Sequence, residues 1–539
     1  MNDRRWLTFL FLSLSLSVPF SCAVAASPLV AQTTAKSNVL FIVVDDLKPM
    51  LGAYGDALAK TPNIDRLAKM GTVFLKSYAQ QAVCAPSRAS LLTGQRPDVT
   101  KIWDLKTLIR EVNPGIVTLP EFFKQNGYAT VGIGKVFDAR SVDEQSDAQS
   151  WSVAYQRPTS RDFAAGLERP SQGHYQNPNT RRLAQQFEEQ GRKNGLTGAP
   201  LKDFVKGKIF PAYESENVPD DAYTDGAVAR VAVRTLGELA KQKTPFFYAV
   251  GFVKPHLPFV APKAYWDLYE HVKIPLAAFR ERSKDAVDVA YTSISGGELG
   301  SGYTDSVGNR LFDASSVLSD GTQRNLIHAY YASVSYTDAQ VGKVLDELKK
   351  QGLEKNTIIV LWGDHGWHLG DHLLWAKHTN FEQATHAPLI IVSPKHKGGQ
   401  RVEGLTEFVD VFPTLSELAG LKTPANLAGV SLVNLLNDPN AAGRRFALSQ
   451  YPRDNDRLMG YAIRSARYRY VAWLEKNFRG DALTMQFRQA ATELYDMQND
   501  PNETANLARD PASKSTLDEH QKYLMDFLAQ QKPLDTSRH

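Results

Sequence analysis

Three acidic residues follow two strand-like segments that lie far apart in this 539-residue sequence. Asp45 and Asp46 come directly after the apolar residues 39–44, and Asp364 comes after residues 358–362 and one glycine. Short apolar runs without alternation are typical of strands that are buried on both faces of a parallel sheet. Ligands of such sheets lie beyond the carboxyl ends of the strands, so we expect the two acidic clusters to converge there.

These acidic clusters favour a bound metal ion. Carboxylates that share one small site repel one another unless a cation compensates their charge. Their oxygen atoms are the ligands that the hard ions Ca²⁺ and Mg²⁺ prefer in proteins. Capping of the helices that follow would also explain either cluster alone.

Cys84 lies in a segment that is typical of a helix N-terminus. Pro86 opens a helical pattern that Gly94 ends, so the cysteine lies at or just before the first turn. The free N–H groups and the dipole at such a position favour negative charge, which gives a nucleophile anion-binding surroundings. A lone cysteine is otherwise usually a small buried apolar residue.

The motif Cys84-x-Pro86-x-Arg88, followed by Leu92-Thr93-Gly94, resembles the signature of the type I sulfatases. In that family a maturation enzyme oxidises the cysteine to formylglycine after translation. The resemblance extends over nearly the whole chain, from Asp45-Asp46 to residues 493–496. It implies an alkaline-phosphatase-like fold and a formylglycine-generating enzyme as a partner in maturation.

Within the family, the sequence is most similar to the iduronate-2-sulfatases. The motifs that carry this similarity are residues 80–88, 94–98, 254–259, 364–367 and 375–377. His365 is a discriminating position, because many other sulfatases have asparagine there.

The resemblance implies a calcium site and a mechanism. The implied ligands are Asp45, Asp46, Asp364, His365 and the modified Cys84. An imidazole is a poor match for a hard ion on general grounds, so the place of His365 in this set rests on the family. One hydroxyl of hydrated formylglycine, oriented by the metal and Arg88, would attack sulfur and expel the sugar alcohol. The second hydroxyl would then expel sulfate.

The family positions also imply cations that neutralise the sulfate oxygens. These are Lys135, Lys254, His256 and Lys377. Either His256 or Lys377 would protonate the leaving alkoxide. His368 and His378 lie close to the motif and are expected behind the site or at its rim, with His378 a candidate for substrate binding. Arg96 and Asp98 are expected to be structural.

One position departs from the pattern of the subgroup. In the subgroup, the motif that corresponds to residues 134–137 is followed by histidine, whereas this sequence has Asp138 at that position. A carboxylate that faces a sulfate pocket repels the substrate unless a cation pairs with it. Either the substrate is positioned differently, with Asp138 among its contacts, or the carboxylate turns away.

The elements that must position these residues alternate along the chain. Further strand-like segments are residues 246–252 and 388–392, and helical patterns cover residues 63–70, 119–125, 222–241 and 330–350. This alternation predicts an α/β fold with a large, mostly parallel sheet and helices on both faces. Two polar stretches with little periodicity, residues 141–220 and 280–322, are predicted to be surface insertions.

The pattern changes after about residue 440. Shorter, more polar strands at 461–464 and 468–473 and a terminal helix at 517–531 predict a smaller antiparallel subdomain. We therefore divide the chain into a signal segment (1–25), a catalytic domain (26–440) and a C-terminal subdomain (441–539).

Residues 1–25 have the order of a secretory signal, in which Arg4-Arg5 precede an apolar stretch and then Ala23-Val24-Ala25. The mature protein is expected to begin near Ala26 and to be secreted or periplasmic. Acylation of Cys22 in a lipoprotein is the alternative. No other stretch approaches the roughly 20 apolar residues of a membrane span.

The composition is that of an ordinary globular protein, with 43% hydrophobic and 22% charged residues. The formal net charge of +4 is too small to argue for a nucleic-acid partner. The leading hypothesis is a secreted, exo-acting sulfatase that removes the 2-O-sulfate of a uronic acid in a sulfated polysaccharide. The alternatives are a formylglycine-dependent phosphodiester or phosphonate monoester hydrolase, and a catalytically dead glycan-binding relative. The intact cluster of acidic and basic residues argues against the last.

Overall fold

The computed structural model describes residue 10 and residues 36–291, 297–312, 317–475 and 488–530. Apart from Leu10, the expected signal segment lies outside the described residues, and so does Cys22. The described helices are all too short or too polar to cross a membrane.

Within the described residues, seven strands form the main sheet in the order β3-β5-β1-β7-β8-β2-β9. Their bounds are β1 (Asn38–Val44), β2 (Thr72–Tyr78), β3 (Ala129–Gly134), β5 (Phe246–Phe252), β7 (Thr357–Gly363), β8 (Leu389–Val392) and β9 (Gln400–Glu407). Neighbouring strands are parallel except at β8, which runs antiparallel to both β7 and β2. The mostly parallel sheet is confirmed, and the strand expected at residues 388–392 is its one antiparallel strand among the described residues. A buried apolar run looks the same in either direction.

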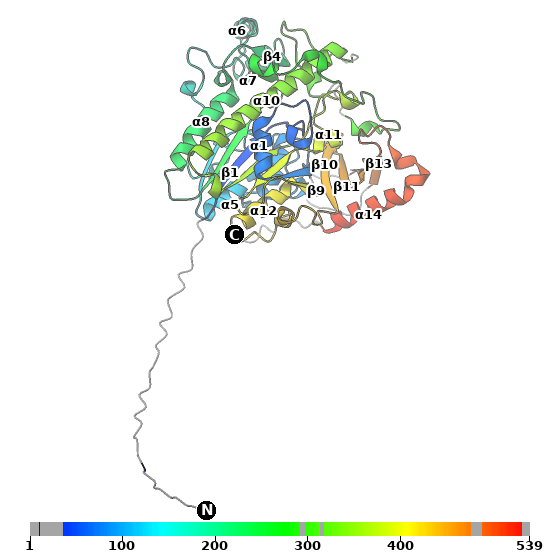
Figure 1. Cartoon of the computed structure of the whole chain (residues 1–539). Coiled ribbons are helices and arrows are strands. Elements are labelled where there is room, and N and C mark those ends of the chain that lie inside the picture. Colours follow the sequence, from blue (N-terminus) through cyan, green and yellow to red (C-terminus); the bar gives the residue numbers. More distant parts are fainter. Residues whose placement is uncertain (1–9, 11–35, 292–296, 313–316, 476–487, 531–539) are drawn as a thin grey trace, which may run out of the picture. The chain divides into compact units, whose positions relative to one another are not determined.

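Helices cover both faces of this sheet (Figure 1). Every residue of β1 is buried, and alternate residues point to opposite faces. On one face they join a core that includes α1 (Pro62–Met70), α8 (Thr224–Leu239) and α10 (Asp320–Lys350). On the other face the core includes α2 (Cys84–Thr93), α5 (Leu119–Gln125) and α12 (Val411–Leu418).

The long helix α10 begins ten residues before the expected position. Ser319 caps it, because its hydroxyl oxygen accepts a hydrogen bond from the backbone N–H of Thr322. The shorter helices of the described chain are α3 (Pro97–Thr100), α4 (Ile109–Val112), α9 (Lys263–Trp266), α11 (Glu382–Thr385) and α13 (Val433–Asn437).

Residues 141–220 are more ordered than their polar composition indicates. They contain α6 (Pro178–Lys193), α7 (Gly198–Lys206) and β4 (Tyr213–Glu216). Strand β4 pairs in parallel with β6 (Phe259–Pro262). The labels of α6, α7 and β4 lie close together in Figure 1. The helix was missed because the segment is strongly polar overall, and its few apolar side chains, such as Leu183 and Phe187, pack in a small core shared with α7.

The C-terminal region forms a separate antiparallel sheet, as expected. Its strands are β10 (Phe446–Arg453), β11 (Leu458–Ser465), β12 (Tyr468–Glu475) and β13 (Arg488–Asp496). The terminal helix α14 (Lys514–Gln530) packs against this sheet through Leu524 and Leu528. Figure 1 shows these elements together in orange and red.

Two glycines bring the ends of β3 and β5 close together. Gly134 pairs with Gly251 and has a φ of 77°, which side chains with a Cβ rarely adopt. A Cβ on Gly251 would lie 2.2 Å from the backbone carbonyl of Lys135. The close approach therefore fixes where Lys135 leaves the sheet.

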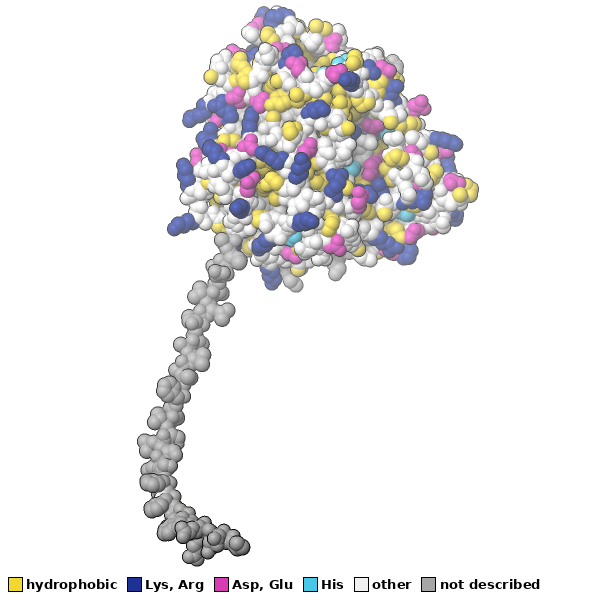
Figure 2. Space-filling view, viewed as in Figure 1, with side chains coloured by type: hydrophobic (Ala, Val, Ile, Leu, Met, Phe, Trp, Pro, Cys, Tyr) yellow, Lys and Arg dark blue, Asp and Glu magenta, His cyan; other side chains and the backbone are white. Residues whose placement is uncertain are grey.

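On the visible face of the molecule (Figure 2), charged side chains of the two signs are intermixed. Figure 2 shows Lys and Arg side chains interspersed with Asp and Glu over the visible face. This distribution agrees with the small formal net charge of the sequence.

Candidate functional site

The two acidic clusters meet at the carboxyl edge of the main sheet. Val44 at the end of β1 pairs with Gly363 at the end of β7, so Asp45 and Asp364 leave the sheet side by side. The backbone N–H of Asp46 donates to Oδ1 of Asp364 at 2.9 Å. All three carboxylates are fully buried.

Helix α2 begins at Cys84 and directs the thiol at these carboxylates. Sγ lies 3.4 Å from Nε2 of His365 and 4.0 Å from Oδ1 of Asp46. Burial, with the negative charge of Asp45, raises the pKa of the Cys84 thiol well above its ordinary value. An unmodified cysteine at this position would therefore be a neutral thiol and a weak nucleophile.

Arg88 lies one helical turn after Cys84 and joins the two acidic clusters. Its Nη2 donates to Oδ1 of Asp45 and its Nε donates to Oδ2 of Asp364, both at 2.9 Å. Nη1 donates to the backbone carbonyl of Val136 at 3.0 Å. Because the guanidinium is fully buried, it compensates two carboxylates that water cannot reach.

Two lysines complete the charge compensation. Nζ of Lys135 lies 2.5 Å from Oδ2 of Asp45, and Nζ of Lys377 lies 2.9 Å from Oδ1 of Asp46. Burial would raise the pKa of Asp45, but Lys135 and Arg88 hold it well below its ordinary value. Burial raises the pKa of Asp46 well above its ordinary value against the charge of Lys377, and the negative charges of Asp45 and Glu298 add to the rise.

His256 lies at the edge of the same cluster. Its Nε2 is 3.9 Å from Oδ2 of Asp46 and 3.7 Å from Oε1 of Glu298. Its Nδ1 donates to the carbonyl of Leu257 at 2.6 Å, which fixes the ring. Burial and the charge of Lys377 lower the pKa of His256 to about 3, so the ring is neutral here.

Glu298 is a site residue that the sequence analysis missed. Its Oε2 lies 3.2 Å from Nζ of Lys377, so the lysine bridges Glu298 and Asp46. The residue comes from the polar stretch 280–322, which carries no motif that would single it out. The structure directs this part of the stretch at the site rather than only along the surface.

A cavity of about 900 Å³ opens over the cluster. Its charged lining includes Asp45, Lys135, Asp138, Arg140, Arg157, Lys206, Glu298 and Lys377, and the neutral rings of His256 and His378 also line it. This volume falls in the range of small-molecule binding sites. The excess of basic groups favours an anionic ligand.

The donor atoms at the floor of the site fit a hard divalent cation. Asp45, Asp364, Cys84 and His365 place one ligand atom each within 4.8 Å of one another, and a second such group contains Asp46 with Asp45, Cys84 and His256. Three buried carboxylates supply the oxygen ligands that Ca²⁺ and Mg²⁺ prefer. A bound cation would also favour the ionised form of Asp46, which burial disfavours.

Lys254 does not reach the cavity. Its Nζ donates to the backbone carbonyls of His256 at 2.6 Å and of Pro258 at 2.7 Å, and the residue is not among those that line the cavity. It holds the loop that carries His256. His378 does line the cavity, whereas His368 is buried and bonds to Thr379 at 2.8 Å.

Asp138 is paired with a cation that the sequence analysis did not single out. Its two carboxylate oxygens accept from Nε and Nη2 of Arg140, each at 2.8 Å, and Lys135 lies 3.5 Å away. Burial would raise the pKa of Asp138, but Arg140 and Lys135 hold it below its ordinary value. The carboxylate is thus an ion-pair partner, and Arg140, with 54% of its side chain exposed, faces the cavity.

Arg96 and Asp98 lie away from the cavity and connect α3 to other elements. Nη2 of Arg96 is 2.6 Å from Glu407 at the end of β9, and Asp98 accepts from the hydroxyl of Tyr461 at 2.6 Å. These contacts tie the region after α2 to the C-terminal sheet.

Known proteins resemble this chain over most of its length. Residues 37–421 match the sulfatase family, and residues 370–530 match the family described as N-sulphoglucosamine sulphohydrolase, C-terminal. Human iduronate 2-sulfatase is 33% identical over an alignment of 546 positions, gaps included, that covers 89% of this chain and 92% of the human protein. A solved structure described as a 2-O GAG sulfatase has a TM-score of 0.62 and 23% identity, with 92% of each chain covered. The phosphonate monoester hydrolase of Agrobacterium radiobacter has a TM-score of 0.66 and 24% identity, with 92% of this chain and 96% of that chain covered.

The role of Arg88 leads to a testable prediction. Arg88→Met leaves two buried carboxylates without their shared partner, so we expect the free energy of unfolding to fall by about 3–5 kcal/mol. Urea denaturation of both proteins measures this change. The control is Arg192→Met, whose ion pair with Glu188 is exposed and should contribute less than about 1 kcal/mol. Equal losses in the two variants would contradict the account.

Proposed function

This chain belongs to the sulfatase family and is a sulfuric ester hydrolase, and we propose that it removes the 2-O-sulfate of a uronic acid in a sulfated glycan. The observation that carries this proposal is the floor of the cavity. There the start of α2, three buried carboxylates and the ammonium groups of Lys135 and Lys377 converge. The similarity to human iduronate 2-sulfatase supports the 2-O-sulfate of a uronic acid as the ester that is hydrolysed.

We propose that Cys84 is converted to formylglycine and that a calcium ion binds beside it. Asp45, Asp46, Asp364 and His365 would hold the ion together with the modified residue. Calcium supplies Lewis-acid activation and charge compensation, and hydrated formylglycine supplies the hydroxyl nucleophile. The neutral state of the buried thiol supports the need for this modification.

The residues of the chain have distinct proposed roles around the ester. Arg88 orients the start of α2 against Asp45 and Asp364 and so positions residue 84. Lys135 and Lys377 neutralise the sulfate oxygens as charge develops in the transition state. Lys377 also donates the proton to the leaving alcohol, because His256 is neutral and its Nδ1 proton is held by Leu257.

Recognition of the uronic acid is assigned to Arg140. Its guanidinium is fixed by Asp138 on one side, and it remains half exposed toward the cavity on the other. A planar guanidinium binds carboxylates in a bidentate geometry that a lysine does not reproduce. His378, which lines the same cavity, contacts the sugar ring in this proposal, and Lys254 supports the loop of His256.

The remaining proposals concern processing and organisation. Residues 1–25 act as an export signal, so that the protein works outside the cytoplasm, and a formylglycine-generating enzyme modifies it. Residues 26–440 form the catalytic part, and residues 441–539 form the C-terminal subdomain. The four antiparallel strands from Phe446 onward support this boundary.

Substrate choice tests the proposed function. We expect the kcat/KM for a disaccharide with a terminal 2-O-sulfated uronic acid to exceed that for an aryl phosphonate monoester by at least about 100-fold. Arg140→Gln should lower the first value about tenfold and leave turnover of a small aryl sulfate nearly unchanged, because that ester carries no carboxylate. A higher kcat/KM for the phosphonate would instead identify a phosphonate monoester hydrolase, and no turnover of any ester would identify a glycan-binding relative.

The state of residue 84 provides a second test. A proteolytic peptide that spans Cys84 should have the mass of formylglycine, and the active protein should resist alkylation at this position. Cys84→Ser should keep the fold, measured by circular dichroism and thermal unfolding, but lose turnover, because serine has no second hydroxyl for release of sulfate. Fully active protein with an alkylatable thiol at Cys84 would refute the mechanism.

A further inference from the structure

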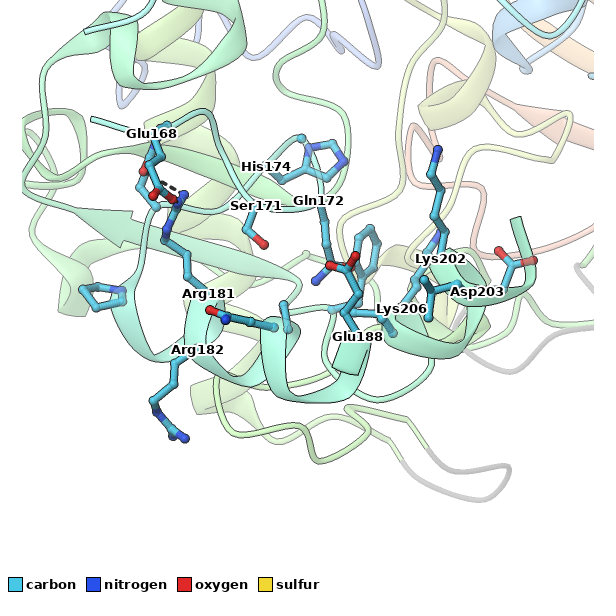
Figure 3. Close-up of a pocket in the computed structure, with 18 of the residues that line it drawn as sticks. Glu168, Ser171, Gln172, His174, Arg181, Arg182, Glu188, Lys202, Asp203 and Lys206 are labelled. Carbon is cyan, nitrogen blue, oxygen red and sulfur yellow. Dashed lines mark hydrogen bonds and ion pairs between the residues drawn. The ribbon is translucent and has the colours of Figure 1, made fainter. Parts of the chain in front are cut away.

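A second, larger cavity lies in the polar stretch that surrounds α6 and α7 (Figure 3). Its volume is about 1200 Å³, and it is lined by the loop 166–176 and by one side of each of these two helices. The described residues of this region build a small core of their own, which includes Ala184, Leu201 and Val205. This small core therefore holds the residues that line the cavity in place.

The two cavities meet. His174, Lys206 and Phe210 line both the catalytic cavity and this outer cavity. The proximity is also electrostatic, since burial and then the charge of Lys254 lower the pKa of His174. A chain-like ligand could thus extend from the catalytic residues into the outer cavity without leaving the protein surface.

The charged groups of the outer cavity divide into paired and free ones. Glu168 is paired with Arg181, and Glu188 is paired with Arg192. Figure 3 shows Lys202 and Lys206 on the opposite side of the cavity from Glu168 and Arg181.

Among the described residues, neither Lys202 nor Lys206 forms an ion pair with a carboxylate in the way that Arg181 and Arg192 do. Asp203 is the remaining acidic residue of the lining, and against it stand the ammonium groups of Lys202 and Lys206 and the guanidinium of Arg182. The unpaired charge of this wall is therefore positive.

Phe210 adds an apolar surface beside one of these cations. Nζ of Lys206 lies 4.5 Å from the centre of the Phe210 ring, a cation–π contact that holds the ammonium at the junction of the two cavities. An aromatic face next to free cations and to the amide and hydroxyl groups of Gln172 and Ser171 suits a sugar that carries negative charge.

We propose that the outer cavity is a second binding site for the glycan, which takes the anionic sugar units next to the unit that carries the scissile ester. Lys202 and Lys206 bind the sulfate or carboxylate groups of those units. This inference rests on the proposed function, and it assigns the polar stretch 166–210 to selection of longer oligosaccharides over disaccharides.

Chain-length dependence tests the inference. The substrates are a disaccharide and a hexasaccharide that end in the same 2-O-sulfated uronic acid. We expect the wild-type protein to have a higher kcat/KM on the hexasaccharide, with a preference that weakens as salt is raised. Lys202→Gln/Lys206→Gln should reduce the ratio of the two kcat/KM values about three- to tenfold, mainly through KM on the hexasaccharide.

The matched control is Lys193→Gln/Lys241→Gln, which removes two exposed lysines that line neither cavity. This control should keep the wild-type ratio. A ratio near one in the wild-type protein, or an unchanged ratio in Lys202→Gln/Lys206→Gln, overturns the second site while the proposed function stands. Failure of the wild-type protein to hydrolyse either oligosaccharide overturns both proposals.

Discussion

The structure of the site depends on the charge of three carboxylates that are buried together. Asp45, Asp46 and Asp364 have no access to water, and their mutual repulsion would oppose folding without cations of matching position. Arg88 bridges two of them, while Lys135 and Lys377 each reach one. The same arrangement gathers, at one edge of the sheet, the groups to which we assign recognition of the sulfate ester.

The parallel strands of the sheet deliver these groups to one place. In the order β3-β5-β1-β7, each strand ends just before a residue of the site or its supporting loop. Lys135, Asp45 and Asp364 directly follow β3, β1 and β7. Lys254 follows β5 after one intervening residue. The glycines at 134 and 251 keep β3 close enough for its lysine to reach Asp45. The register of the strands therefore decides which cations reach which carboxylates at the site.

The sequence predicts those site residues that stand in short, local sequence patterns. Strand ends followed by acids, a cysteine at a helix start and a motif that resembles a known family are all readable along the chain. They led to the convergence of Asp45 with Asp364 and to Cys84 at the first turn of α2. They also left open whether Asp138 faces the substrate or turns away; in the structure Asp138 lines the cavity and pairs with Arg140.

The residues that were missed depend on long-range contacts without a local pattern. Glu298 and the free lysines of α7 come from polar stretches whose composition resembles a surface loop. The direction of β8 is set by its pairing with β2 and β7, and nothing in four apolar residues encodes it. Helix α6 is mostly polar, and its few apolar side chains pack in a small core with α7 rather than in the main core.

Calcium binding tests the central claim, that the buried carboxylates form a cation site. Isothermal titration of the metal-depleted protein should show one Ca²⁺ per chain, and saturation at 100 times Kd should stabilise the fold by about 2.7 kcal/mol. Asp46→Asn should weaken binding at least tenfold, whereas the control Asp346→Asn, at an exposed ion pair, should not. An active protein that binds no divalent ion, or equal affinity in both variants, would contradict the account.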